Sequence, residues 1–247
     1  MRRSLLGCIA GLVLILVAPV SRSQTFVVGV EQTDYYPVYA VRDGQYAGFA
    51  RDLLDAFGKK HGYQFQYSAL PIKRLFSDFL TKDTLDFKFP DNPNWQTGMK
   101  EGIAVNYSKP AFESTEAGMV LPENVGKPLA AVKTLGTIRG FTPWPYQDAI
   151  ASKAIALEES DDMASLVQKA LVKRVDAVFL CEATANYYVN EVLKKPGALV
   201  PDRGLPSNPV EFQLSSRKHP EIIKQFDAFM ESEKALIDEL RKKYKLQ

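Results

Sequence analysis

The chain has few residues of the types that build disulfides, metal sites or catalytic triads. It contains two cysteines and two histidines among its 247 residues. His61 and His219 lie far apart in the sequence, and neither has metal ligands or triad partners at a recognisable spacing. Cys181 follows an apolar run, which indicates a buried, unreactive thiol. We therefore expect no catalytic residue, no metal site and no cofactor.

Long hydrophobic runs are also scarce, and the one present lies at the N-terminus. Two arginines precede an apolar stretch from Leu5 to Val20, and small residues follow up to Ser23. This order is typical of a secretory signal peptide. The stretch is short for a membrane span, and no second apolar run of that kind follows. We predict a signal peptide at residues 1–23, cleaved near Ser23, and a periplasmic mature protein.

The sequence has no large excess of charge of either sign. Its 31 Lys and Arg residues face 29 Asp and Glu residues, and three of the basic residues belong to the predicted signal peptide. The mature chain is therefore close to neutral. Because nucleic-acid-binding surfaces are normally basic, we expect no nucleic-acid partner. Cys181 would be the only cysteine left after cleavage, so the mature protein would depend on its hydrophobic core and not on disulfides.

Strand and helix patterns alternate along the mature chain. Apolar or alternating runs typical of strands occur at 26–30, 63–67, 134–138 and 175–180. Helical spacing of apolar residues, or a helix start signal, predicts helices over 49–61, 72–80, 143–152 and 163–171. Gly62 is the predicted C-cap of the first of these helices, and Thr142 and Ser160 are predicted N-caps. Repeated alternation favours an α/β fold with mostly parallel sheets.

Two stretches rich in proline and glycine divide the chain. Residues 122–128 separate two α/β blocks, and residues 196–209 end the second block. An amphipathic region follows at 220–244. The sequence therefore predicts two blocks and a C-terminal helical region.

Several short motifs between residues 26 and 110 occur in a particular order. After the strand at 26–30 come Tyr35-Tyr36-Pro37, then Gly48-Phe49 and Asp86, and finally Tyr107-Ser108-Lys109-Pro110. The order and spacing of these motifs resemble those in the extracytoplasmic solute-binding proteins of family 3, which deliver polar amino acids and related solutes to ABC transporters. Further along, residues 175–178 and 211–218 resemble that family's second-lobe strand and crossover strand. The resemblance thus covers nearly all of the mature chain.

The resemblance implies a two-lobe periplasmic binding protein type II fold. Each lobe of that fold is a mostly parallel sheet flanked by helices, and a two-strand hinge joins the lobes. It implies a first lobe of residues 24–117 and 210–247, and a second lobe of residues 118–209. It also implies a monomer that binds a small-molecule solute and an inner-membrane ABC permease as its partner.

The chain departs from the resembled family where that family holds the ligand. Members for α-amino acids usually carry Thr-x-x-Arg, whose arginine binds the ligand carboxylate, but here the segment ends at Lys100. Lysine is a point charge and does not reproduce the bidentate pair. Where the family tends to place an aspartate for the ligand ammonium, this chain has Cys181, followed by Glu182. We expect a site that differs from the usual amino-acid clamp.

Two loops are the main candidates for this site. The stretch from Lys88 to Trp95 contains a cation, an acid, amides and an indole after a predicted strand, and ligands bind at such strand ends in open α/β sheets. The alternative is an ordinary turn and a packed core tryptophan. Arg139-Gly140-Phe141-Thr142 joins a strand to a helix start and is a candidate anion site. A solvated arginine beside a helix cap is the alternative there.

The remaining candidates are aromatic or charged side chains near these loops. Glu182 would accept an ammonium or cap its helix, and Arg74 would face the cleft or pair on the surface. The complete set of predicted ligand-binding residues is Tyr35, Tyr36, Arg74, Lys88, Asp91, Asn92, Trp95, Lys100, Arg139, Gly140, Thr142, Trp144 and Glu182.

The sequence favours a non-enzymatic periplasmic solute-binding protein that captures an amino acid, amine or organic acid between two lobes. A second hypothesis is a periplasmic enzyme, because the resembled fold also hosts a prephenate-type dehydratase. Such an enzyme needs a proton-transferring carboxylate, for which Asp91 and Glu182 are the candidates. A third is a ligand-sensing module for a membrane signalling protein.

Overall fold

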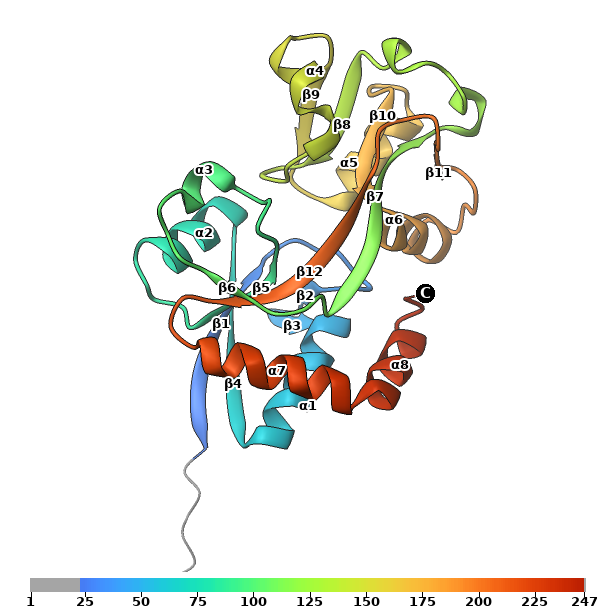
Figure 1. The fold of residues 1–247 in the computed structure, drawn as a ribbon. Coiled ribbons are helices and arrows are strands. Elements are labelled where there is room, and N and C mark those ends of the chain that lie inside the picture. Colours follow the sequence, from blue (N-terminus) through green and yellow to red (C-terminus); the bar gives the residue numbers. More distant parts are fainter. Residues whose placement is uncertain (1–22, 247) are drawn as a thin grey trace, which may run out of the picture.

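The computed structural model describes residues 23–246, which form two lobes (Figure 1). The predicted signal peptide lies outside the described residues except for Ser23. Among the described residues, no helix is both long and apolar enough to cross a membrane.

The strands join into one curled sheet that runs through both lobes (Figure 1). Its order is β4-β1-β5-β12-β7-β10-β8-β9, with β11 paired to β7 and β6 to β12, while β2 and β3 form a separate hairpin. The strands are β1 Gln24–Glu31, β2 Ala40–Arg42, β3 Gln45–Ala47, β4 Tyr63–Leu70, β5 Phe87–Asp91, β6 Asn106–Tyr107, β7 Phe112–Val120, β8 Thr134–Ile138, β9 Ala156–Ser160, β10 Ala177–Cys181, β11 Val200–Pro201 and β12 Asn208–Ser216.

Helices cover the sheet in both lobes. The α-helices are α1 Phe49–His61, α2 Ile72–Leu80, α3 Thr97–Lys100, α4 Gln147–Ala151, α5 Met163–Leu171, α6 Glu182–Tyr187, α7 Pro220–Ser232 and α8 Lys234–Lys243. The short 3₁₀ helices are η1 Pro122–Asn124, η2 Leu129–Ala131 and η3 Trp144–Tyr146, and a π-helical turn, η4 Tyr188–Val192, extends α6. The predicted C-terminal amphipathic region thus forms α7 and α8, which pack on the first lobe (Figure 1).

The centre of each lobe is a small parallel sheet. In the first lobe β1 pairs in parallel with β4 and β5, and in the second lobe β8 pairs in parallel with β9 and β10. β5 and β10 are buried along their whole length, as expected for parallel strands covered on both faces. Parallel strands end at the same edge, so each lobe presents its strand-end loops on one side.

Two antiparallel strands, β7 and β12, connect the lobes (Figure 1). β12 pairs with β5 in the first lobe and with β7 along the crossing, and β7 continues to pair with β10 in the second lobe. The predicted lobe bounds, residues 24–117 with 210–247 and residues 118–209, place both changes of lobe within or beside these two strands. These bounds stay a prediction.

Three helix caps are predicted from the sequence, and the observed helix ends agree with one of them. Gly62 ends α1 in the left-handed conformation, with φ of 73°, as predicted. The predicted cap Ser160 is wrong, because Ser160 ends β9 and the carboxylate of Asp162 accepts from the Ser165 N–H instead. The predicted cap Thr142 is also wrong: the segment begins with the 3₁₀ turn η3, and no side chain caps α4. Ser160 lies two residues before the observed cap Asp162, and Thr142 lies two residues before the start of η3.

Candidate functional site

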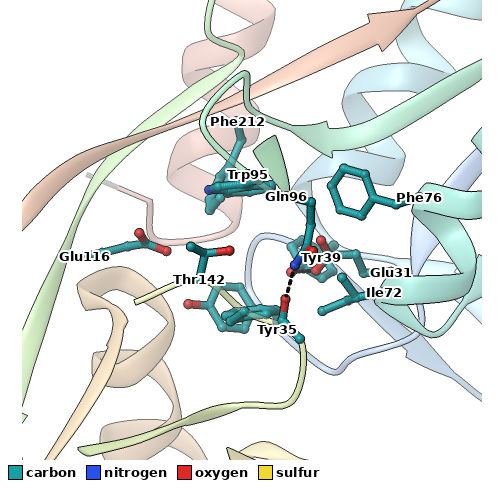
Figure 2. Close-up of a pocket in the computed structure, with 12 residues that line it drawn as sticks. Glu31, Tyr35, Tyr39, Ile72, Phe76, Trp95, Gln96, Glu116, Thr142 and Phe212 are labelled. Atoms are coloured by element: carbon teal, nitrogen blue, oxygen red, sulfur yellow. Dashed lines mark hydrogen bonds between the residues drawn. The ribbon is translucent and has the colours of Figure 1, made fainter. Parts of the chain in front are cut away.

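A cavity lies between the lobes, and its walls come from both of them and from the crossing strands (Figure 2). The cavity volume is about 20 Å³, which is enough for roughly one water molecule. The residues that line it are Glu31, Tyr35, Tyr39, Ile72, Phe76, Trp95, Gln96, Glu116, Gly140, Phe141, Thr142 and Phe212.

The first-lobe wall is built at the carboxyl ends of its parallel strands. Glu31 is the last residue of β1, and the loop after it carries Tyr35 and Tyr39. Trp95 and Gln96 follow β5, which lies beside β1 in the sheet. This is the edge at which open α/β sheets bind ligands.

The opposite wall comes from the loop after β8. Gly140, Phe141 and Thr142 belong to this loop and face the first lobe. The side wall comes from Glu116 on β7 and Phe212 on β12, the two strands that connect the lobes. A molecule in this cavity would therefore contact both lobes and the hinge.

Direct hydrogen bonds already join the two lobes around the cavity. The side-chain amide of Gln96 donates to the carbonyl oxygen of Gly140 at 3.0 Å (Figure 2). The Cys181 backbone N–H donates to the Tyr35 hydroxyl at 2.9 Å, and the Thr184 hydroxyl donates to the Tyr35 carbonyl oxygen at 3.4 Å. The structure is therefore a closed arrangement of the lobes.

Aromatic rings make up much of the cavity wall. Tyr35 stacks on Tyr39 at 5.3 Å between ring centroids and meets the edge of Phe141 at 5.2 Å. On the other side Trp95 packs against Phe212 at 5.7 Å. Pairs of this kind fix the orientation of each ring. The cavity thus has rigid, electron-rich walls.

Two carboxylates face the cavity. Glu31 and Glu116 are buried, and in Figure 2 they lie on opposite sides of the group formed by Tyr35, Thr142 and Trp95. Burial, with a smaller contribution from the negative charge of Glu31, raises the pKa of Glu116 to about 7, and a hydrogen bond from Asn208 opposes the shift. Burial also raises the pKa of Glu31, against the charge of Lys88 and a hydrogen bond from the Tyr39 hydroxyl.

A buried cluster of ions lies next to the cavity in the first lobe. Both lysines of the predicted set contact Asp91, Lys100 at 3.0 Å and Lys88 at 3.4 Å from the carboxylate, and the Ser215 hydroxyl donates to it at 2.7 Å. Lys88 and Asp91 are both fully buried. Lys88 also lies 4.3 Å from the centroid of the Phe76 ring. The charges of Lys88, Lys100 and Asp91 thus compensate one another within the protein.

Comparison with known proteins identifies the architecture. Neither a protein family model nor a curated protein sequence matches the chain. Among solved structures, an ancestral arginine-binding protein bound to arginine is similar with a TM-score of 0.71 and 21% identity, over 89% of this chain and 97% of that one. The chain has the fold of the two-lobe periplasmic binding proteins. The fold predicted from the resemblance to family 3 is therefore confirmed.

Two further structures with this two-lobe fold are similar to the chain. One is the arginine-, lysine-, histidine-binding protein ArtJ from Geobacillus stearothermophilus, with a TM-score of 0.70 and 21% identity over 90% of this chain and 95% of that one. The other is an ancestral amino acid-binding protein that is a precursor of cyclohexadienyl dehydratase, with a TM-score of 0.67 and 19% identity over 89% and 95%. At these identities the comparison establishes the fold.

The two-lobe fold brings four of the predicted site residues together at the cavity. Tyr35 and Trp95 line it from the first lobe, and Gly140 and Thr142 line it from the second. Lys88, Asp91, Asn92 and Lys100 lie behind this wall in the first lobe. Asn92 donates from its side chain to the Glu211 carbonyl oxygen at 3.0 Å, and so ties its loop to β12.

The other five predicted residues do not line the cavity. Arg139 is exposed and pairs with Glu159 and Asp161, and Arg74 is exposed and pairs with Asp78. Glu182 pairs with Arg203 and caps no helix, because α6 has no side-chain cap. The exposed Arg74 and Arg139 match the surface alternatives left open by the sequence, whereas the pair of Glu182 with Arg203 matches neither role predicted for Glu182.

The two remaining aromatic residues line other surface depressions. Tyr36 lies under the guanidinium of Arg42, at 4.1 Å, in a groove beside α6. Trp144 is 40% exposed and lines an outer groove that also includes Trp95 and Glu116.

Neither cavity carboxylate, Glu31 or Glu116, is among the residues predicted from the sequence. Glu31 ends the apolar run Phe26–Val30, at the strand end where a ligand is expected, and this position was a usable signal. Glu116 directly precedes the apolar residues 117–121 and begins the buried part of β7. A lone acid beside an apolar run has many structural explanations, and only its position at the hinge connects it with the cavity.

Proposed function

We propose that the protein is a solute-binding protein that closes its two lobes on a small polar solute. The observation that carries this proposal is a cavity walled by both lobes and by both hinge strands, with Tyr35 and Trp95 on one side and Gly140 and Thr142 on the other. Apolar walls with a few placed polar groups are typical of small-molecule sites. One of the similar solved structures named above is bound to arginine, and another is an arginine-, lysine-, histidine-binding protein.

The closed arrangement explains how binding would be coupled to motion. A cavity with room for roughly one water cannot admit a solute without movement of the lobes. A solute that contacts both lobes binds the closed state better than the open one, and so shifts the population towards closure. We infer that β7 and β12 act as the hinge.

The exported state and the partner are part of the same proposal. The N-terminal pattern supports a periplasmic location, and a closed, loaded form is the state that an inner-membrane ABC permease would recognise. We infer that the protein acts as a monomer and delivers its solute to such a permease. Size-exclusion chromatography with light scattering checks the first point, and reconstitution with the candidate permease checks the second.

Calorimetry combined with small-angle scattering tests the binding proposal. Amino acids, amines and organic acids are titrated into the mature protein, and one of them should bind with 1:1 stoichiometry and reduce the radius of gyration. Trp95→Ala should weaken binding about tenfold or more, since large aromatic contacts dominate such sites. Arg139→Ala should leave binding unchanged, because this side chain is exposed and outside the cavity. The absence of binding by every class would refute the proposal.

A second function, catalysis, is favoured by one observation. Glu116 is a buried carboxylate at the cavity with a pKa of about 7, which suits a general acid or base at neutral pH. One of the similar structures is a precursor of a dehydratase. The carboxylates nominated from the sequence, Asp91 and Glu182, lie outside the cavity lining. Incubation with six-membered-ring carboxylic acids and detection of a dehydrated product separates this function from reversible binding.

A further inference from the structure

We propose that the solute is an organic cation without a carboxylate, an alkylamine or alkyldiamine, and that Glu116 holds its ammonium group. This inference rests on the proposed binding function and specifies its ligand class. It depends on the charges that remain unpaired around the cavity.

Glu116 lacks a cationic partner among the described residues. The residue is 7% exposed and lines the cavity from β7 (Figure 2). Its one hydrogen-bond donor in the described part of the chain is the Asn208 amide, at 3.4 Å, and no described Lys, Arg or His lies within 4 Å of it. A buried carboxylate with so little compensation is unfavourable unless it is protonated or a cation joins it. A bound ammonium supplies both the charge and the hydrogen bonds that are missing.

The lysines closest to the cavity do not serve Glu116. Lys88 and Lys100 both contact Asp91, and the Lys88 ammonium also donates to the Pro90 carbonyl oxygen at 2.5 Å. With Glu31 ionised, the cations Lys88 and Lys100 balance the anions Asp91 and Glu31 on the first-lobe side. Glu116 is then the excess charge of the site, and a monovalent cation neutralises it. Glu31 also faces the cavity, but its charge is already included in that balance, so Glu116 holds one ammonium of an alkyldiamine and the second ammonium meets no further uncompensated anion in the lining.

The cavity lining, all from described residues, has no cationic side chain to pair with a ligand carboxylate. It includes no lysine, arginine or histidine. In the predicted anion loop the Gly140 N–H already donates to Glu159 and the Phe141 N–H to the Ile138 carbonyl oxygen. A carboxylate in this space would meet two acids and no free cation. An amino acid is therefore disfavoured relative to the amine that lacks its carboxylate.

The aromatic walls suit the same ligand class. Tyr35, Tyr39 and Trp95 present ring faces or edges around the space between the two acids (Figure 2). Ring faces attract cations and also accept the methylene groups of an alkyl chain. A narrow slot with acids at separate positions and apolar rings between them matches an aliphatic amine chain.

Matched pairs of ligands test this inference by isothermal titration calorimetry. Lysine is 1,5-diaminopentane with one added carboxylate, and arginine is related to agmatine in the same way. We expect 1,5-diaminopentane or agmatine to bind, and lysine and arginine to bind at least about tenfold more weakly, since their added carboxylate would be buried without a cationic partner. Equal or tighter binding of the amino acids would overturn the inference.

A matched pair of variants tests the role of Glu116. Glu116→Gln keeps the size of the side chain and should weaken amine binding about tenfold or more. Glu113→Gln, on the same strand but exposed, should bind as the unmodified protein does. Circular dichroism and thermal melts show whether each variant is folded. Amine affinity that is unchanged in folded Glu116→Gln would also overturn the inference.

The result distinguishes failure of this inference from failure of the proposed function. If an amino acid or organic acid binds with closure and no amine does, the binding function stands and the cation assignment is wrong. If no solute of any class binds, both are wrong.

Discussion

The hydroxyl of Tyr35 in the first lobe accepts a hydrogen bond from the backbone N–H of Cys181 in the second lobe, at 2.9 Å. Both residues are buried, so this bond exists only while the lobes are closed and water is excluded. Tyr35 also lines the cavity. One side chain therefore contacts the proposed ligand space and stabilises the closed state.

Tyr35→Phe should weaken ligand binding by favouring the open state. The substitution leaves the Cys181 N–H buried without a partner in the closed form, which costs about 1–3 kcal/mol, or about five- to one-hundredfold in affinity. Calorimetry gives the affinity, and small-angle scattering gives the degree of closure. Tyr146→Phe is the control, because the buried Tyr146 hydroxyl has no hydrogen-bond partner among the described residues. An unchanged affinity in Tyr35→Phe would show that this bond does not contribute to closure.

Stability should fall as pH rises from about 4.5 to 7 because of Glu116. Its pKa is about 7 in the folded protein against an ordinary value of 4.5, so the folded state binds more protons in this interval. The contribution is therefore complete below pH 4.5 and lost as pH rises through 7, with a size of about 3 kcal/mol. Glu31 acts in the same direction, since its pKa is also raised.

Thermal unfolding between pH 4.5 and 8 measures this dependence. Glu116→Gln should reduce the slope and should be more stable than the unmodified protein at pH 8. Glu113→Gln should keep the original slope. The charged or titratable neighbours that act on Glu116 or respond to its charge are Glu31, Tyr35 and Cys181. The same proton competes with a bound amine, so amine affinity should fall as pH drops below 7. A slope equal in Glu116→Gln and the unmodified protein would contradict the assignment.

Asp91→Asn should destabilise the folded protein strongly. The substitution leaves Lys88, which is fully buried, and Lys100 without their counter-charge. Removal of one partner of a buried ion pair lowers the free energy of unfolding by about 3–5 kcal/mol. Urea unfolding measures the loss, with Asp238→Asn as the control, since Asp238 is exposed and, among residues 23–246, pairs only with Arg241 at 3.6 Å. A loss below about 0.5 kcal/mol in Asp91→Asn would mean that the cluster contributes no net stability.

Gly29→Ala should destabilise the first lobe through overpacking. A Cβ at Gly29 in β1 would lie 2.4 Å from a Leu85 methyl and 2.5 Å from a Leu75 methyl. Overpacking of this kind costs about 1–3 kcal/mol. Gly98→Ala, where a Cβ has no neighbour within 4 Å, should be neutral or slightly stabilising. Equal melting temperatures for the two variants would show that the leucines adjust without penalty.

Most of the fold was predictable because its signals are local. Strands such as 134–138, and helices such as 72–80, have a hydrophobic period that matches the observed element. The left-handed cap at Gly62 depends on the residue type itself. The cap of α5 was predicted wrongly because a hydroxyl and a carboxylate, Ser160 and Asp162, compete within two residues of each other, and the cap predicted for α4 was wrong because no side chain caps that helix.

The candidate site was predictable only in part. Trp95 and Thr142 stood out because they lie in polar loops after strands, where ligand contacts concentrate. Arg139 stood out for the same reason, but its guanidinium pairs with Glu159 in the neighbouring strand β9 and with Asp161 directly after that strand. Whether a charged side chain is free or paired depends on residues distant in sequence.

The sequence by itself determined the alternation of strands and helices, the near-neutral charge, and the motif order that indicates a two-lobe binding protein, because period, composition and spacing are properties of neighbouring residues. Only the tertiary structure decided which charges remain unpaired at the cavity. Asp91 meets Lys88 and Lys100, whereas Glu116 lies buried at the crossing strands with a single weak donor, Asn208. The physical reason is that compensation of a buried charge depends on distances of a few ångströms between residues that the chain separates widely.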